Sequence, residues 1–225
     1  MSFSVLIADT HDITRLGVQS VVDTTAGHVV GTAGTGLEAI SMAEEHEPDL
    51  MIMSLRLPHL NGFDVLYHLE RCSLDTDVIV LAACDDEERV RSVFEHGAAA
   101  YLCKQDSLDE LRRALHAVRA GRTYVSDALP DTLAVPRPRG DGAPPATDPA
   151  LTSRERQVVQ LTAEGFTSRE IGEALSISHR TVEKHRENIK KKLGAKSVVE
   201  VALFAFRRTV LPDVRVLQGR PRPSA

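Results

Sequence analysis

Short, continuous apolar runs recur through the first half of this 225-residue chain, and each is followed by a stretch in which apolar residues return with helical spacing. Runs such as VLIA, LMIM and VIVLAA are uninterrupted, which is typical of strands that helices cover on both faces of a sheet. Regular alternation of strands and helices favours a parallel sheet, because a crossover helix joins each strand to the next. The pattern therefore predicts an α/β domain with a five-stranded parallel sheet.

The apolar runs and the stretches between them define the expected elements. The predicted strands are Ser4–Ala8, His28–Ala33, Asp49–Met53, Asp77–Ala82 and Ala100–Leu102. The predicted helices are Asp12–Asp23, Gly36–Glu45, Gly62–Arg71, Asp86–Glu95 and Ser107–Ala120. In doubly wound, flavodoxin-like sheets of this kind, ligands bind at the carboxyl ends of the strands. The side chains expected at that edge are Asp9, Ser54, Ala82 and Lys104.

Proline divides the chain into two parts. Residues 126–150 contain six of the eleven prolines. Because proline lacks an amide hydrogen and a free φ angle, this density predicts an extended linker rather than a helix or a central strand. The predicted organisation is an α/β domain over residues 1–125, a Pro-rich linker over 126–150, a second domain over 151–210 and a loose tail over 211–225.

The second domain carries signals for helices only. Thr152 and Thr167 are each followed three residues later by a glutamate, which is the pattern of a capping box. Gly165 and Gly194 suit helix ends, and Ser178 suits a helix start. The predicted helices are 153–163, 168–175, 179–193 and 197–208. The second and third of these, joined through the segment LSIS, are predicted to form a helix-turn-helix.

Charge is distributed unevenly along a chain whose net charge is −5. Residues 1–130 carry 10 basic and 21 acidic side chains, whereas residues 151–208 carry 12 basic and seven acidic ones. The basic second domain is therefore expected to meet any polyanionic partner. No apolar run approaches the roughly 18 residues that span a bilayer, and the N-terminus lacks the pattern of a signal peptide, so a cytoplasmic protein is expected.

The third helix of the second domain has two different faces. With 100° of rotation per residue, an inward stripe is predicted from Val182, His185, Ile189 and Leu193. The opposite face carries Arg180, Lys184, Glu187 and Lys191, with Glu183 and Asn188 at its margins. Long polar side chains on such a face can reach base edges and phosphates. The alternative is a small helical interaction domain whose charges only keep it soluble.

These helices closely resemble the LuxR-type helix-turn-helix domain over residues 151–206, most specifically in the stretch SHRTVEKHRENIKKKLG. With the first domain included, the chain is similar to the NarL/FixJ family of two-component response regulators. The resemblance implies a transcription regulator, not an enzyme, that inserts its third helix into the major groove of double-stranded DNA. It also implies base contacts from Glu183, Lys184 and Glu187, and phosphate proximity for Thr181, His185 and Lys191. The last helix is expected to pair two copies of the chain through Val198, Val199 and Ala202.

The resemblance also bears on how the first domain is switched. Phosphorylation of a receiver requires a carboxylate nucleophile, a divalent cation held by neighbouring carboxylates, and a hydroxyl and a lysine that bind the phosphoryl oxygens. In the family these groups follow the strands where this chain has Asp9, Thr10, Ser54, Ala82 and Lys104. Asp9 and Lys104 match the pattern, and the other three do not. The resemblance therefore implies an atypical receiver that keeps the fold and acts without aspartyl phosphorylation.

Two other interpretations of the first domain remain open. One makes it mainly a protein-interaction or ligand-sensing module that sequesters a kinase or a partner regulator. The other makes it a flavodoxin-like enzyme that uses a nucleotide or flavin, although the glycines of GTAGTG are explained by a turn before a helix. Receiver dimerisation is the control mechanism that needs the fewest assumptions, and a protein partner or small ligand in the altered pocket is the alternative.

The cysteines give no sign of a metal site. Cys72, Cys84 and Cys103 match no ligand spacing such as Cys-x-x-Cys. They are expected to be reduced and packed, and no metal or cofactor is expected. A metal or redox site that combines Cys84 and Cys103 with His11 and His59 near the strand ends is the alternative.

Overall fold

The computed structural model describes residues 2–82, 87–129 and 151–208, with side chains of the last helix described as far as Leu203. The chain divides into two compact units, one built from the sheet and its helices and one from four C-terminal helices. Most of the predicted linker and the whole predicted tail lie outside the described residues. The two units are described separately below.

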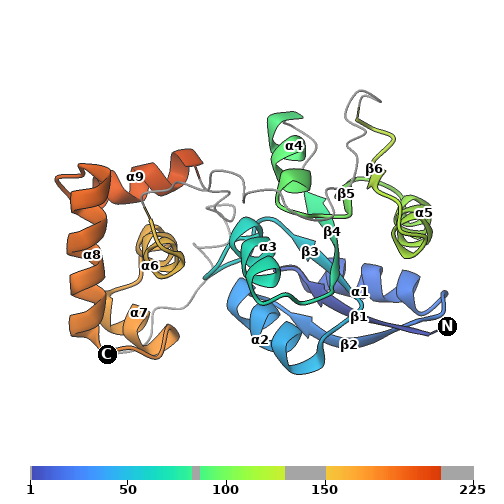
Figure 1. The fold of residues 1–225 in the computed structure, drawn as a ribbon, viewed down its shortest axis with the longest axis horizontal. Helices are drawn as coiled ribbons and strands as arrows, with labels where there is room; N and C mark the ends of the chain where they lie inside the picture. Colours follow the sequence, from blue (N-terminus) through green and yellow to red (C-terminus); the bar gives the residue numbers. More distant parts are fainter. Residues whose placement is uncertain (1, 83–86, 130–150, 209–225) are drawn as a thin grey trace. The chain divides into compact units, whose positions relative to one another are not determined.

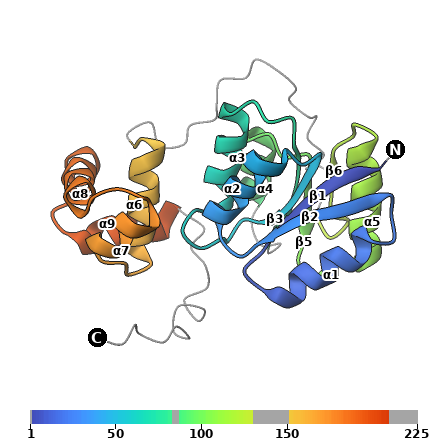
Figure 2. The same cartoon turned by 90° about the horizontal axis from the view of Figure 1, so that it is seen from below.

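The first unit is a parallel sheet with helices on both faces, as predicted. Its strand order is β2-β1-β3-β4-β5-β6, and every pairing is parallel. The strands are β1 (Phe3–Ala8), β2 (Gly27–Ala33), β3 (Leu50–Ser54), β4 (Asp77–Ala82), β5 (Ala100–Cys103) and β6 (Tyr124–Val125). The helices are α1 (Asp12–Val22), α2 (Gly36–His46), α3 (Gly62–Arg71), α4 (Glu87–Glu95) and α5 (Leu108–Arg119). Helices α1 and α5 lie together on one face, and α2, α3 and α4 cover the other (Figures 1 and 2).

The central strands form the core of the unit, because helices cover both of their faces, as their continuous apolar sequences predicted. All five residues of β3 are buried, and Leu50, Met51, Ile52 and Met53 have 0% exposure. Side chains from β1, β3, β4 and β5 pack against α1 and α5 in one cluster that includes Ile7, Ile79, Leu102 and Leu115. Because both faces of these strands are covered, an alternating pattern would have buried polar groups.

The prediction of a five-stranded sheet is wrong by one strand. The short strand β6 pairs with the edge of β5 through Ala100↔Tyr124 and Tyr101↔Val125. Backbone bonds extend this edge, since Ser126 N donates to Tyr101 O at 2.9 Å. Two half-buried residues make too short a run to stand out as a strand, so only the tertiary pairing reveals it.

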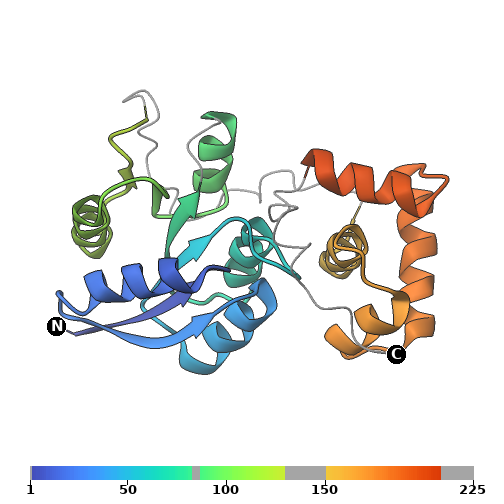
Figure 3. The same ribbon diagram turned by 180° about the vertical axis from the view of Figure 1, so that it is seen from behind.

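The second unit contains α6 (Ser153–Ala163), α7 (Ser168–Ala174), α8 (His179–Leu193) and α9 (Val198–Arg208) (Figure 3). Both predicted capping boxes are present, at Thr152 with Glu155 and at Thr167 with Glu170. The turn between α7 and α8 is tight, because a Cβ on Gly172 would lie 2.7 Å from the carbonyl oxygen of Ile177. This close approach of backbone to helix explains glycine at that position of the helix-turn-helix. Across the described parts of both units, no helix combines the length and apolarity needed to cross a membrane.

Gly62 offers a test of how closely the strand-end loop packs on α3. A Cβ at this position would lie 2.8 Å from Leu55 Cα and 3.0 Å from Ser54 O, both backbone atoms. We expect Gly62→Ala to lower the free energy of unfolding by about 1–3 kcal/mol, because backbone cannot move aside as a side chain can. Urea denaturation followed by circular dichroism measures the change.

The matched control is Gly17→Ala in α1, where an added Cβ meets nothing within 4 Å. This change should leave stability unchanged or raise it by up to about 1 kcal/mol, because alanine has the higher helix propensity. Equal stabilities for the two variants would contradict the packing described at Gly62.

Candidate functional site

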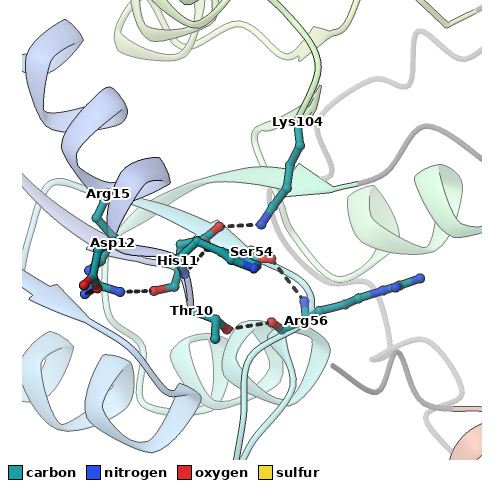
Figure 4. Close-up of polar contacts among 8 residues, drawn as sticks. Thr10, His11, Asp12, Arg15, Ser54, Arg56 and Lys104 are labelled. Carbon is teal, nitrogen blue, oxygen red and sulfur yellow. Dashed lines mark hydrogen bonds and ion pairs between the residues drawn. The ribbon is translucent and has the colours of Figure 1, made fainter. Parts of the chain in front are cut away.

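The carboxyl ends of four parallel strands bring the predicted strand-end residues to one edge of the sheet. Ala8 of β1 pairs with Met53, Ser54 of β3 with Leu81, and Ala82 of β4 with Cys103. The residues that follow β1 and β5 are Asp9 and Lys104. Lys104 Nζ donates to Asp9 Oδ2 at 2.6 Å, across the ends of β3 and β4 (Figure 4).

Asp9 is the charged centre of this site, with only 1% of its surface exposed. Its Oδ1 accepts a hydrogen bond from His11 N at 2.8 Å and lies 3.1 Å from His11 Nδ1. Its backbone carbonyl accepts from Arg15 at 2.5 Å. Each carboxylate oxygen therefore has a partner from the protein, which is what a buried charge needs to be tolerated.

The two hydroxyl residues of the site bind backbone and not the ion pair. Ser54 Oγ accepts from Arg56 N at 3.3 Å, and Thr10 Oγ1 donates to Arg56 O at 3.3 Å (Figure 4). Ser54 is buried, with 2% exposure. Ala82 contributes a methyl group, and its carbonyl accepts from Lys104 N at 2.8 Å. Among Asp9, Thr10, Ser54, Ala82 and Lys104, all within the described part of the chain, the edge therefore has one carboxylate, one ammonium group and two hydroxyls that bind the loop after β3.

The cysteines depart from the expectation that all three are reduced. Cys103, at the end of β5, is disulfide-bonded. Cys72 is exposed and is the free cysteine among the residues that the structure describes. Cys84 lies outside the described residues.

Helix α8 presents its predicted polar face to solvent. Arg180, Lys184, Glu187 and Lys191 are exposed, as is Glu183 at the margin of the face, whereas Asn188 at the margin is half-buried. Thr181 is also exposed. Val182 and Ile189 are buried, with 0% and 1% exposure, as the predicted inward stripe requires. His185 and Leu193 of the same stripe are only half-buried. The helix therefore has one apolar side held by the other helices and a polar side open along its length.

Polar contacts hold α8 against α6 and α7. Lys192 Nζ donates to Glu155 Oε2 at 2.7 Å, and the Glu155 side chain is only 4% exposed. Arg186 donates to Ser168 Oγ at 2.6 Å and to Phe166 O at 3.0 Å. Periodicity had not singled out these contacts, because they join residues 18 to 37 positions apart.

The environment of Glu155 shifts its pKa. Burial alone would raise the pKa of this carboxyl group, but hydrogen bonds from Lys192 and from the amide and hydroxyl of Thr152 outweigh burial and hold the pKa below its ordinary value. The hydrogen bonds from Thr152 are 2.7 Å from the amide and 3.0 Å from the hydroxyl. One carboxylate thus caps α6 and anchors the C-terminal half of α8.

The last helix carries exposed apolar side chains. Val198, Val199 and Leu203 are 39%, 67% and 52% exposed, whereas Val201 is buried at 5%. Ala202 is half-buried. The predicted contact residues therefore form part of an open apolar surface of α9.

Comparison with known proteins matches both units to family models. The response regulator receiver domain matches residues 5–116, and the luxR family of bacterial regulatory proteins matches residues 149–205. The nitrate/nitrite response regulator protein NarL of Escherichia coli K12 is 32% identical over 208 residues, which cover 92% of this chain and 96% of that protein. The chain belongs to the NarL-like response regulators. Members of this family combine a receiver with a DNA-binding domain, and this chain is accordingly a DNA-binding transcription regulator.

Other relatives and solved structures agree with the family. The response regulator GacA of Pseudomonas aeruginosa is 31% identical over 206 residues, covering 90% of this chain and 95% of that protein. The signal receiver domain of NarL from Mycobacterium tuberculosis is 28% identical with a TM-score of 0.52, over 54% of this chain and 98% of that one. RcsB from Salmonella enterica serovar Typhimurium, solved bound to a promoter, shares the fold with a TM-score of 0.53 and 22% identity, over 92% of this chain and 99% of that one.

The ion pair between Glu155 and Lys192 predicts how the stability of the helical unit depends on pH. Replacing Lys192 with methionine leaves the buried carboxylate short of its charged partner, so we expect a loss of about 1–3 kcal/mol near neutral pH. Because the folded-state pKa of Glu155 lies below its ordinary 4.5, the carboxylate stabilises the fold above about pH 4.5, and this contribution is lost as the pH falls through the folded pKa.

Scanning calorimetry of the intact chain should therefore show Lys192→Met differing from the wild type near neutral pH and converging with it in acid. Lys191→Met is the matched control, because Lys191 is exposed and lies on the opposite polar face. A stability difference that stays constant with pH would contradict the role assigned to the ion pair.

Proposed function

We propose that this response regulator binds specific DNA sequences as a dimer and that its receiver acts without aspartyl phosphorylation. The proposal that the receiver acts without aspartyl phosphorylation rests on the residues at the strand ends. Ser54 is the last residue of β3, and the buried carboxylate of Asp9 is bound by Lys104. The protein would then work in the cytoplasm, where DNA is accessible.

Aspartyl phosphotransfer needs groups that the described residues at this edge do not supply. Ser54 Oγ is a weak nucleophile near neutral pH without a base, and its ester with phosphate would be stable, unlike an acyl phosphate. The magnesium ion needs several hard oxygen ligands, yet the residue after Asp9 is Thr10, whose hydroxyl binds a backbone carbonyl. At the end of β4, Ala82 offers no hydroxyl to a phosphoryl oxygen. The ammonium group of Lys104 forms an ion pair with the Asp9 carboxylate.

The polar face of α8 supports the proposed DNA contacts. Lys184 and Glu187 point outward one turn apart, with Glu183 beside them, and we assign these three to base reading. Arg180, Thr181, His185 and Lys191 are assigned to the phosphate backbone and the groove entrance. Glu183 also bonds to Ser168 Oγ, so base reading by this carboxylate would exchange one hydrogen bond for another.

The open apolar surface of α9 supports pairing of two copies. Val199 exposes two thirds of its surface to water, and Val198 and Leu203 are exposed on the same helix. A second copy that covers Val198, Val199 and Ala202 would bury this surface and place two α8 helices on related half-sites.

The DNA assignment predicts different effects for two lysines on the same face. Lys184→Ala should weaken binding to the operator more than binding to random DNA, by about 1–3 kcal/mol of discrimination, because a base contact is lost. Lys191→Ala should weaken binding to both DNAs equally and reduce the salt dependence of affinity, because a phosphate contact releases counterions. Fluorescence anisotropy at several salt concentrations measures both effects. Equal losses on both DNAs for Lys184→Ala would refute the base-reading role.

The receiver assignment predicts that Ser54→Asp alone does not restore phosphorylation. The new carboxylate supplies a nucleophile, but Thr10 and Ala82 still leave the cation and the phosphoryl group short of ligands. These missing groups stabilise one transition state, so their effects should couple. We expect the triple variant Thr10→Asp, Ser54→Asp, Ala82→Thr to be the smallest change that gains a phosphoryl group.

Intact-mass measurement after incubation with acetyl phosphate and magnesium tests the series. The wild type and Ser54→Asp should show no adduct, and the triple variant should show one that hydroxylamine removes. A hydroxylamine-labile phosphate on any aspartate of the wild-type receiver would show that phosphotransfer persists.

A further inference from the structure

Three metal-binding side chains of different types converge where α2 meets α3. Glu44 lies on α2, and His68 lies on α3. Cys72 follows the last residue of α3, and its amide donates to His68 O at 3.0 Å, so the helical course continues to it. His68 and Cys72 are therefore neighbours on one helix face, four residues apart, and Glu44 reaches them from the adjacent helix.

The donor atoms of this cluster are close to the spacing of a tetrahedral metal site. His68 Nε2 lies 2.7 Å from Glu44 Oε1 and 3.3 Å from Cys72 Sγ, and all three donor atoms lie within 4.8 Å of one another. With metal–nitrogen bonds of about 2.0 Å and metal–sulfur bonds of about 2.3 Å, the ligand atoms of tetrahedral zinc are about 3.3–3.6 Å apart. Opening the 2.7 Å separation between His68 Nε2 and Glu44 Oε1 by about 0.6 Å would bring it into this range, and the 3.3 Å separation between His68 Nε2 and Cys72 Sγ already lies at the lower end of the range.

The environment also favours a cation. Glu44 is near the end of α2, which finishes at His46, and Cys72 is at the end of α3, so the negative ends of two helix dipoles point toward the cluster. The side chains of His68 and Glu44 are 33% and 52% exposed, and Cys72 is an exposed free thiol, so an ion can enter from solvent. His68 and Glu44 alone would be an ordinary hydrogen-bonded pair on the surface. The Cys72 thiol is a third donor that approaches the same point, and this distinguishes the cluster from such a pair.

We propose that Glu44, His68 and Cys72 form a binding site for a divalent transition-metal ion of the zinc type, with water as the fourth ligand. The combination of thiolate, imidazole and carboxylate suits zinc and disfavours magnesium and calcium, which take oxygen ligands. Binding releases the proton of the Cys72 thiol. Glu44 and Cys72 then balance the two charges of the ion. The ion links α2 to α3 at the edge of the sheet opposite Asp9 and Lys104, because the helices run antiparallel to the strands.

Cobalt(II) titration of the intact chain, after removal of metals with a chelator, tests this site. One equivalent of cobalt should produce a thiolate-to-cobalt charge-transfer band and the visible bands of tetrahedral cobalt, and zinc should displace them. Cys72→Ser should abolish the charge-transfer band. Glu44→Gln and His68→Gln should each weaken zinc binding by at least about tenfold. Loss of a residue that only hydrogen-bonds to a metal ligand already weakens binding by about this factor, and loss of the ligand itself should weaken it at least as much.

Glu45→Gln is the matched control, since Glu45 is exposed and adjacent to Glu44 on α2. It should bind like the wild type. Alkylation of Cys72 provides a second measurement that does not depend on the variants: zinc should protect this thiol, and magnesium should not. The proposal is overturned by a charge-transfer band that persists in Cys72→Ser, by equal binding to Glu44→Gln and Glu45→Gln, or by alkylation that zinc leaves unchanged.

Discussion

The ion pair between Asp9 and Lys104 is the interaction on which the receiver's strand-end site depends. It joins residues 95 positions apart, at the ends of β1 and β5, and two strands lie between them. Only the parallel register of the whole sheet brings the two groups to 2.6 Å. Asp9 is only 1% exposed, so loss of the Lys104 ammonium group would leave this carboxylate without its charged partner. The pair therefore balances the charge of the Asp9 carboxylate from within the chain.

Much of this architecture could be predicted from local sequence, because local chemistry determines it. Continuous apolar runs specify strands buried on both faces, and Thr152 and Thr167 start helices through contacts within one turn. The short strand β6 could not be found this way. Tyr124 is held by the edge of β5 and by Glu110 Oε1, which accepts its hydroxyl hydrogen at 2.8 Å, and both contacts are tertiary. Burial and this hydrogen bond raise the pKa of Tyr124 to about 12.

The sites were predictable where strand ends or helical periodicity place their residues. Strand ends located Asp9 and Lys104, and helical periodicity located the polar face of α8. The Glu44, His68 and Cys72 cluster escaped a search for closely spaced cysteine ligands, although His68 and Cys72 already stood one helical turn apart. The third donor comes from a different helix, and no spacing along the chain contains that information. The sequence did not indicate the disulfide at Cys103 either.

In the helix-turn-helix, the contacts that hold α8 in place leave the polar side chains of its outer face exposed. Glu155 and Arg186 hold α8 through its inner side, so the lysines of the outer face are not needed for folding. Glu183 is the exception, because it shares Ser168 Oγ with Arg186. If Glu183 turns toward a base, Arg186 keeps both Ser168 and the Phe166 carbonyl, and α8 stays in place. The exchange then costs one exposed hydrogen bond and the 3.7 Å ion pair between Glu183 and Arg186, while the contacts of Arg186 with Ser168 and with the Phe166 carbonyl remain.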